Sequence, residues 1–147
     1  MSPTPKNILV PVDGSEHAIH AVTYGAHLAV ALQAELTVLY VVHATSAEAM
    51  GMRHLDHDSI EASLRAAAAP TLQRVAAALE QVEGLGPHGE IVRFGNPADE
   101  ILTAVSRLGI DQVVMGSRGL NHLQEILLGS VSEKVVRRAP CPVTVVR

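Results

Sequence analysis

The amino-acid sequence predicts an α/β protein, an open parallel β-sheet of five strands with helices on both faces. Three observations lead to this fold class. Short runs rich in valine and isoleucine alternate with longer segments in which apolar residues recur every three or four positions. The short runs are mostly apolar, as in strands that are covered on both faces. Hydrophobic residues make up 48% of the chain and aromatic residues only 2%, so the expected core is aliphatic.

The first part of the chain contains two predicted strands with a helix between them. The run NILVPV, at 7–12, ends at a turn that begins with Asp13, as a buried strand would. Ser15 stands where it can cap a helix to about Gln33, and aliphatic residues along this segment form one buried stripe. The run ELTVLYVV, at 35–42, is the second strand because β-branched residues are frequent in it.

A second, longer helix and a third strand follow. Ser59 precedes a helical pattern that reaches about Val82, and Pro70 lies inside it. A proline removes a backbone hydrogen bond and clashes with the preceding turn, so we expect a kink or a break near Ala69. The run GEIVRF, at 89–94, is the third strand.

The last part of the chain repeats the alternation twice. Asn96 is predicted to cap a helix over 97–108, since a proline and two acidic residues follow it. The remaining elements are a strand over 111–116, a helix over 130–138 and a strand over 142–147. No linker, composition break or long repeat divides the chain, which predicts one domain.

Charge and composition exclude several classes of function. Asp and Glu number 15 against 11 Lys and Arg, and this acidic balance argues against binding to a nucleic-acid backbone. The few aromatic residues offer no stacking platform for bases. A single cysteine, Cys141, excludes a disulfide framework and suggests a reducing compartment. No membrane-spanning run or signal pattern is visible, so we expect a soluble cytoplasmic protein that binds neither nucleic acid nor membrane.

A glycine-containing segment after the fourth strand has the composition of an anion site. The sequence GSRG at 116–119 is followed, after nine residues, by GSVS at 129–132, where the last helix begins. Glycines let backbone amides approach an anion, and a helix N-terminus favours a phosphate. The spacing fits neither the Walker A loop nor the dinucleotide fingerprint. The local pattern equally allows a plain loop with a glycine C-cap and a serine N-cap.

Three features together resemble the universal stress protein family. They are the turn Pro11-Val12-Asp13-Gly14-Ser15, the glycine segment, and the Cys-Pro-Val start of the last strand. The resemblance covers essentially the whole chain. It implies one adenine nucleotide α-hydrolase-like domain over 1–147, with the strands in the order 3-2-1-4-5. It also implies a homodimer formed through the C-terminal strand.

Members of this family that carry the glycine motif bind ATP, and the motif is intact here. The resemblance therefore implies ATP as ligand, with Mg²⁺ accompanying the phosphates. The implied adenosine contacts are Pro11, Val12, Asp13, Val41, Met115 and Gly116. The implied phosphate contacts are Gly119, Gly129, Ser130, Val131 and Ser132. Arg118 could reach a phosphate through its planar guanidinium or lie in solvent as a loop cation.

The chemistry of Asp13 supports its assignment independently, because a carboxylate at a strand end can accept hydrogen bonds from ribose hydroxyls. The alternative is that Asp13 only forms the turn before the helix. His54 and His57, with two aspartates beside them, have metal-ligand types but are expected to lie in a solvated loop. His17 and His20 share a helix face and are expected at the surface.

No residues form a recognisable catalytic motif, so no catalytic residue is predicted. The leading hypothesis is an ATP-binding stress-response protein without efficient turnover. One alternative is a slow ATPase, autokinase or adenylyl-transfer enzyme at the same site. The other is a nucleotide-free interaction module in which the glycine segment shapes a protein-binding surface.

Overall fold

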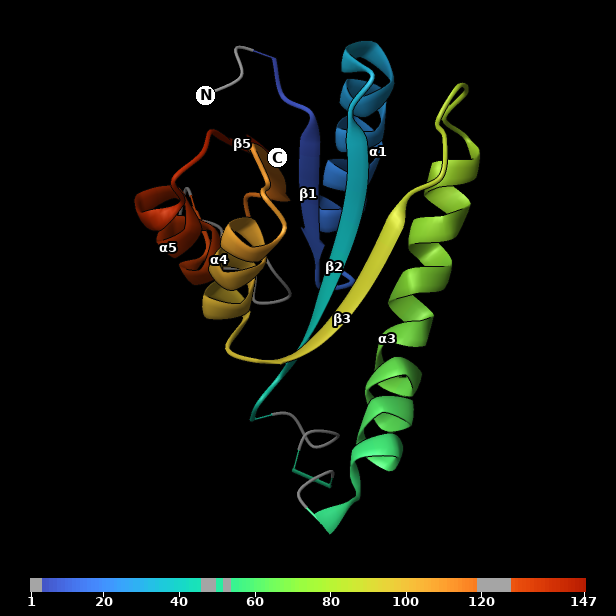
Figure 1. Ribbon diagram of the computed structural model, residues 1–147, viewed down its shortest axis with the longest axis vertical. Helices are drawn as coiled ribbons and strands as arrows, with labels where there is room; N and C mark the ends of the chain where they lie inside the picture. Colours follow the sequence, from blue (N-terminus) through green and yellow to red (C-terminus); the bar gives the residue numbers. More distant parts are fainter. Residues whose placement is uncertain (1–3, 46–49, 52–53, 119–127) are drawn as a thin grey trace.

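The computed structural model in Figure 1 describes residues 4–45, 50–51, 54–118 and 128–147. Its sheet has five strands in the order β3-β2-β1-β4-β5. The strands are β1 (Asn7–Val12), β2 (Glu35–His43), β3 (Gly89–Gly95), β4 (Gln112–Gly116) and β5 (Val143–Val146). All four neighbouring pairs are parallel. The predicted fold class and strand order are confirmed.

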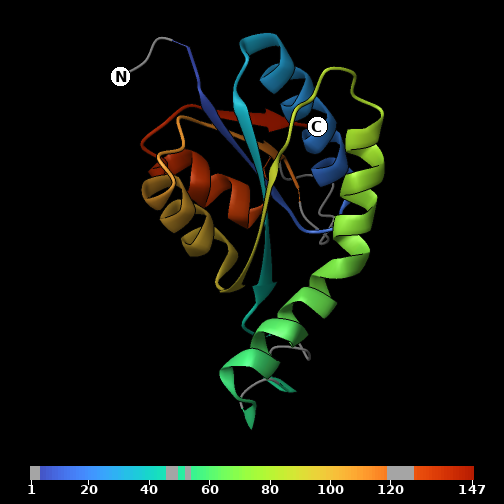
Figure 2. The same cartoon turned by 45° about the vertical axis from the view of Figure 1, so that its right-hand side comes forward.

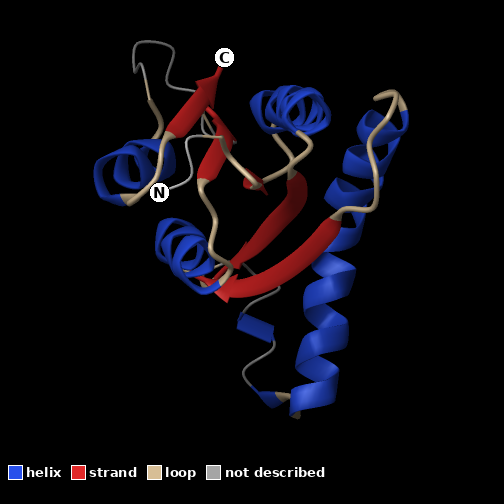
Figure 3. Ribbon diagram, turned by 45° about the horizontal axis from the view of Figure 1, so that its top comes forward, coloured by secondary structure: helices blue, strands red, loops and turns tan. Residues whose placement is uncertain are grey.

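In the described part of the chain, four helices cover the two faces of the sheet (Figure 3). They are α1 (Glu16–Leu32), α3 (His57–Glu80), α4 (Pro97–Arg107) and α5 (Ser130–Arg138). The first two pack on one face and the last two on the other. Within the described residues, no helix has both the length and the apolar character that crossing a bilayer requires.

The core consists of two aliphatic layers separated by the sheet. Along β1, Ile8 and Val10 belong to the layer under α1 and α3, whereas Leu9 belongs to the layer under α4 and α5. All three are fully buried. This alternation follows from the period of two in a strand, and it explains why the run was apolar at consecutive positions.

Of the two outcomes expected near Ala69, a kink or a break, the break is wrong. α3 runs through Pro70 without interruption, and its axis changes direction along its length in Figure 2. Pro70 has no N–H to donate to the Ala66 carbonyl, which therefore lacks its usual helical partner. Both residues are exposed, so water can donate to that carbonyl instead. The helix also begins before Ser59, because the Asp56 carboxylate caps it by accepting from the Ser59 N–H at 2.8 Å. Hydrogen bonds from the backbone and the side chain of Ser59 lower the pKa of Asp56.

Helix α1 approaches the central strand at a glycine. A Cβ built on Gly25 would lie 2.7 Å from Cγ2 of Val10, closer than real Cβ contacts. The helix axis can lie this near β1 only because the side chain is absent.

The two edges of the sheet differ in chemistry. β3 carries Glu90 and Arg93, both exposed, and the Arg93 guanidinium donates to the Val92 carbonyl at 3.0 Å. β5 contains only valine and threonine, all half-buried. Charged side chains discourage pairing at a sheet edge, so β5 is the less protected of the two edges.

Candidate functional site

The candidate site lies where the strand order reverses, at the carboxyl ends of β1 and β4. The chain leaves β1 towards β2 on one side, and leaves β4 towards β5 on the other. Ligands of open α/β sheets bind in the crevice at such a position. The turn that begins at Asp13 and the segment that begins at Gly116 therefore emerge at the same edge, as the sequence predicted. Val41 also lies there, since Val12, the last residue of β1, pairs with Tyr40 of β2.

The turn between β1 and α1 is built by three consecutive residues. Gly14 has a φ of +86°, in the left-handed region that glycine tolerates best. The Ser15 N–H donates to Oδ1 of Asp13 at 3.0 Å, and the Ser15 hydroxyl accepts from the Ala18 N–H at 3.2 Å. Asp13 is thus a turn former and Ser15 is the predicted helix cap. Asp13 remains partly exposed beyond the strand end.

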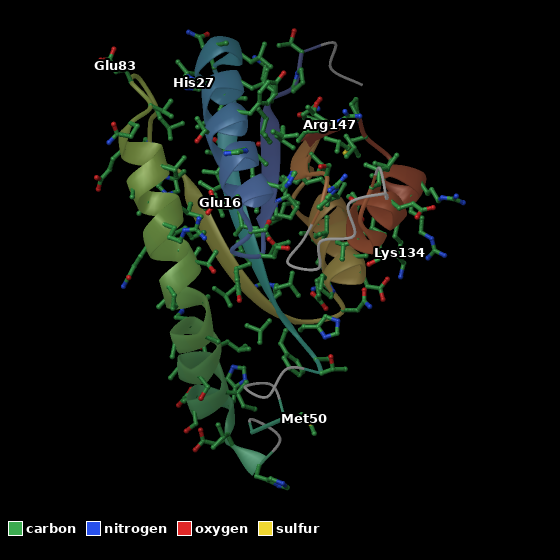
Figure 4. The ribbon with its side chains drawn as sticks, turned by 180° about the vertical axis from the view of Figure 1, so that it is seen from behind. Glu16, His27, Met50, Glu83, Lys134 and Arg147 are labelled. Carbon is green, nitrogen blue, oxygen red and sulfur yellow. The ribbon has the colours of Figure 1, made fainter. Side chains whose placement is uncertain are left out.

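A side chain from α3 braces this turn from outside. The Arg74 guanidinium donates to the Gly14 carbonyl and to Oε1 of Glu16, each at 2.6 Å. Figure 4 labels Glu16 in the first turn of α1, beside α3. Sequence reasoning missed Arg74, because its partners lie about sixty residues away in the chain and no local pattern marks them.

Gly116, at the end of β4, packs directly against the first turn of α1. A Cβ built on Gly116 would lie 2.9 Å from both the carbonyl carbon and Cβ of His17. The helix backbone cannot yield easily, so glycine is needed for this close approach. Gly116 therefore has a structural role in addition to the ribose contact that the resemblance implies.

Ser117 joins four segments at the candidate site. Its N–H donates to the Val146 carbonyl of β5 at 2.8 Å. Its carbonyl accepts from the Gly129 N–H at 2.7 Å and from the Ser132 hydroxyl at 3.0 Å. Its own hydroxyl hydrogen-bonds to Nδ1 of His17 at 3.2 Å. Ser117 is 3% exposed, and sequence reasoning missed it, although its position between two residues of the glycine segment was a usable signal.

The start of α5 lacks the side-chain cap that the other described helices have. Ser15, Asp56 and Asn96 each cap a helix through a side-chain oxygen, whereas α5 has Gly129 at its N-cap and no side-chain cap bond. The serine cap considered from the sequence is therefore wrong. The first bond within the helix runs from the Glu133 N–H to the Gly129 carbonyl at 2.9 Å. The N–H groups of residues 130–132 come before that bond, so they have no acceptor within α5.

The predicted phosphate residues differ in exposure. Ser130 is exposed and Val131 is half-buried. Ser132 is buried, and its hydroxyl lies 3.0 Å from both the Ser117 and the Gly129 carbonyls, so it bonds within the chain. Gly119 lies outside the described residues. Arg118 is half-buried, and its carbonyl accepts from the Ser15 hydroxyl at 3.5 Å.

The predicted adenosine residues are mostly aliphatic and buried. Pro11, Val12 and Met115 are buried at the ends of β1 and β4. Val41 is half-buried and packs on the core layer under α4 and α5. The structure brings these residues to one edge of the sheet. A cavity of about 260 Å³ lies elsewhere, between α3 and β3, on the far side of β2 from the strand-order reversal.

Cys141 makes none of the described contacts at this site, and His57, which was expected in a loop, is the first residue of α3. Burial raises the pKa of the Cys141 thiol, and the negative charge of Asp111 raises it further. A raised pKa keeps the thiol protonated at neutral pH, and the protonated thiol is a poor nucleophile. Among the described residues, no three His, Cys, Asp or Glu side chains gather in a way that could hold a metal ion.

Comparison with known proteins gives similarities over nearly the whole chain. A model of the universal stress protein family matches residues 4–147. Universal stress protein YxiE of Bacillus subtilis (strain 168) is 35% identical over 144 residues, which cover 95% of this chain and 97% of the relative. Universal stress protein UspA from Lactobacillus plantarum has a TM-score of 0.77 at 30% identity, covering 99% of this chain and 100% of that chain. A universal stress protein solved in complex with cAMP has a TM-score of 0.65 at 27% identity, covering 98% of both chains.

Proposed function

The chain belongs to the universal stress protein family, and on that premise we propose that it is a cytoplasmic stress-response protein that binds ATP where β1 and β4 end. The observation that carries the proposal is the N-terminus of α5. Its first amides have no side-chain cap, and Ser117 holds Gly129 against the end of β4. The positive end of a helix dipole and unpaired amides suit a phosphate. The relative that was solved with cAMP adds support, since cAMP is an adenine nucleotide.

In the proposed complex, the polyphosphate lies over residues 129–131 and Gly119, with Arg118 beside it and Mg²⁺ bound to the phosphates. Ser132 positions these groups instead of contacting phosphate, because its hydroxyl bonds to carbonyls of the chain. Adenosine lies against Pro11, Val12, Val41, Met115 and Gly116, with the Asp13 carboxylate accepting from the ribose. Aliphatic side chains and backbone groups recognise the base.

We propose that ATP acts as a ligand that stabilises or signals and is not turned over efficiently. Transfer of a phosphoryl group needs an acceptor with a base beside it. The Ser132 hydroxyl is buried and directed at the Ser117 and Gly129 carbonyls, so it is a poor acceptor in this arrangement. The Ser130 hydroxyl is exposed, and no general base for it can be named from the sequence.

Thermal melting with and without Mg-ATP tests the proposed function. A ligand that binds only the folded state raises the melting midpoint, by ~4 °C at ten times its dissociation constant. We expect this rise for the native protein and a much smaller rise for Asp13→Ala, each compared with its own midpoint without nucleotide. If millimolar Mg-ATP leaves the native midpoint unchanged, the proposed function is wrong.

We propose that the protein is a homodimer joined through β5. The Val113 and Ser117 N–H groups donate to the Pro142 and Val146 carbonyls at 3.0 and 2.8 Å. Since alternate residues of a parallel strand face one neighbour, Val143 and Val145 turn their backbone groups to the open edge. Two-fold dimers are the commonest assembly of soluble proteins, and uncharged edges invite pairing.

Replacing Val145 by proline is expected to separate the dimer into monomers, raising the dissociation constant at least about 100-fold. The substitution removes one outward N–H and leaves the bonds to β4 in place. Light scattering after size-exclusion chromatography measures the mass. Phe94→Ser is the control, since it removes a side chain that is 42% exposed on the opposite edge strand. A Val145→Pro protein that keeps the dimer mass would contradict the proposal.

A further inference from the structure

We propose that Arg74, on α3, is a positioning residue for the nucleotide, because it holds the turn that presents the Asp13 carboxylate to the ribose hydroxyls. The inference rests on the proposed function and brings a second helix into that site. Arg74 belongs neither to the turn after β1 nor to the glycine segment after β4. Its contacts with the turn are what point to this role.

The turn from Asp13 to Ser15 fixes the direction of the Asp13 side chain. Oδ1 of Asp13 accepts from the Ser15 N–H at 3.0 Å, which ties the carboxylate to the backbone two residues ahead. Within the described residues, the other oxygen, Oδ2, accepts no hydrogen bond, so it remains for a ribose hydroxyl. The position of that oxygen depends on the conformation of Gly14, which lies between the two bonded residues and has a φ of +86°.

Two side chains of α3 hold Gly14 in place. The Arg74 guanidinium donates through Nη1 to the Gly14 carbonyl and through Nη2 to Oε1 of Glu16, each at 2.6 Å. Thr71, three residues earlier and on the same helix face, is buried, and its Oγ1 would lie 3.0 Å from a Cβ on Gly14. Figure 4 labels Glu16 at the start of α1. The planar guanidinium thus joins the turn to the first turn of α1 at a fixed geometry.

These contacts are expected to matter more for binding than for stability. The Arg74 and Glu16 side chains are 45% and 73% exposed, and ion pairs at such exposure add little to the free energy of unfolding. A carboxylate that is held in place before the ligand arrives loses less conformational freedom on binding. Glu16 offsets the charge of Arg74, so Arg74 acts through the position of Asp13 and not by attracting the phosphates.

Titration calorimetry with Mg-ATP and with Mg-dideoxy-ATP tests the inference, because the dideoxy nucleotide lacks both ribose hydroxyls. We expect the native protein to bind Mg-ATP more tightly than the dideoxy nucleotide. Arg74→Ala should lower the affinity for Mg-ATP about fivefold and leave the affinity for the dideoxy nucleotide unchanged. Arg65→Ala is the matched control, since it removes the same charge from another exposed position of α3, and it should behave like the native protein.

A double variant separates positioning of Asp13 from any other role of Arg74. Once the carboxylate is absent, removing Arg74 should have no further effect, so Asp13→Ala/Arg74→Ala should bind Mg-ATP as weakly as Asp13→Ala alone. Urea denaturation of Arg74→Ala should give a free energy of unfolding close to that of the native protein. A loss of affinity in this variant is then not a loss of folded protein.

An equal loss of affinity for both nucleotides in Arg74→Ala would overturn the inference, since Arg74 would then act on something other than the ribose contact. Additive losses in the double variant, unchanged affinity for Mg-ATP in Arg74→Ala, or equal binding of the two nucleotides by the native protein would overturn it as well. In each of these cases the native protein still binds Mg-ATP, and the proposed function stands. Absence of Mg-ATP binding by the native protein overturns the proposed function itself.

Discussion

Replacing Gly129 by aspartate is expected to abolish ATP binding while the fold stays as stable as before, or becomes slightly more stable. Gly129 is the N-cap of α5, with φ −69° and ψ 166°, a conformation that any residue adopts. Aspartate is among the preferred N-cap residues and improves on glycine by a few tenths of a kcal/mol. Its carboxylate would occupy the amides at the start of the helix and repel the phosphates. We expect affinity for ATP to fall at least about 100-fold.

Affinity for ATP is expected to fall while the free energy of unfolding stays the same or rises, so a loss of binding could not be attributed to unfolding. Urea denaturation measures the free energy of unfolding, and calorimetry measures the affinity of each protein for Mg-ATP. Gly86→Asp is the matched control, because a Cβ at Gly86 would meet nothing within 4 Å. It adds the same charge away from α5 and should change neither quantity. Unchanged affinity in Gly129→Asp would remove the start of α5 from the proposed phosphate site.

Replacing Gly25 by valine is expected to lower the free energy of unfolding by about 3 kcal/mol. Ordinarily a side chain in place of a mid-helix glycine is favourable or neutral. Here the new Cβ would lie 2.7 Å from Cγ2 of Val10, which is fully buried in the central strand. The helix must move away from the sheet, and the layer between them loses its close packing.

Urea denaturation checks this expectation, with Ala31→Val as control. Ala31 is exposed on the same helix, so its replacement should cost only the difference in helix propensity, about 0.6 kcal/mol. Adding Val10→Ala to Gly25→Val removes the methyl group that the new side chain meets. The double variant should be more stable than the sum of the two single changes predicts. Additive effects would show that the Val10 contact is not the cause.

The elements with strong local signals were predicted well. β1 and α5 have the bounds that the sequence predicts. The turn at Asp13 marks the end of β1, and Gly129 marks the start of α5. Pro70 left the prediction of α3 open between a kink and a break, since whether a proline breaks a helix depends on what the freed carbonyl faces. That carbonyl belongs to an exposed residue here, and exposure is set by the tertiary structure.

The candidate site was only partly predictable. The turn after β1 and the segment after β4 had to meet once the sheet was parallel, because the carboxyl ends of its strands share an edge. The contact between His17 and Ser117 joins residues 100 positions apart, and that between Arg74 and Gly14 spans 60. Such contacts depend on how helices rest on the sheet. No spacing in the sequence reports that geometry.

The unequal edges of the sheet also bear on how many chains can assemble. One edge carries the exposed charges of Glu90 and Arg93, whereas the other carries valine and threonine alone. Each chain therefore has one sheet edge that is suited to strand pairing and one edge whose charges oppose it. If the proposed pairing through β5 occurs, it uses the one uncharged edge of each chain, so the expected assembly stops at two chains.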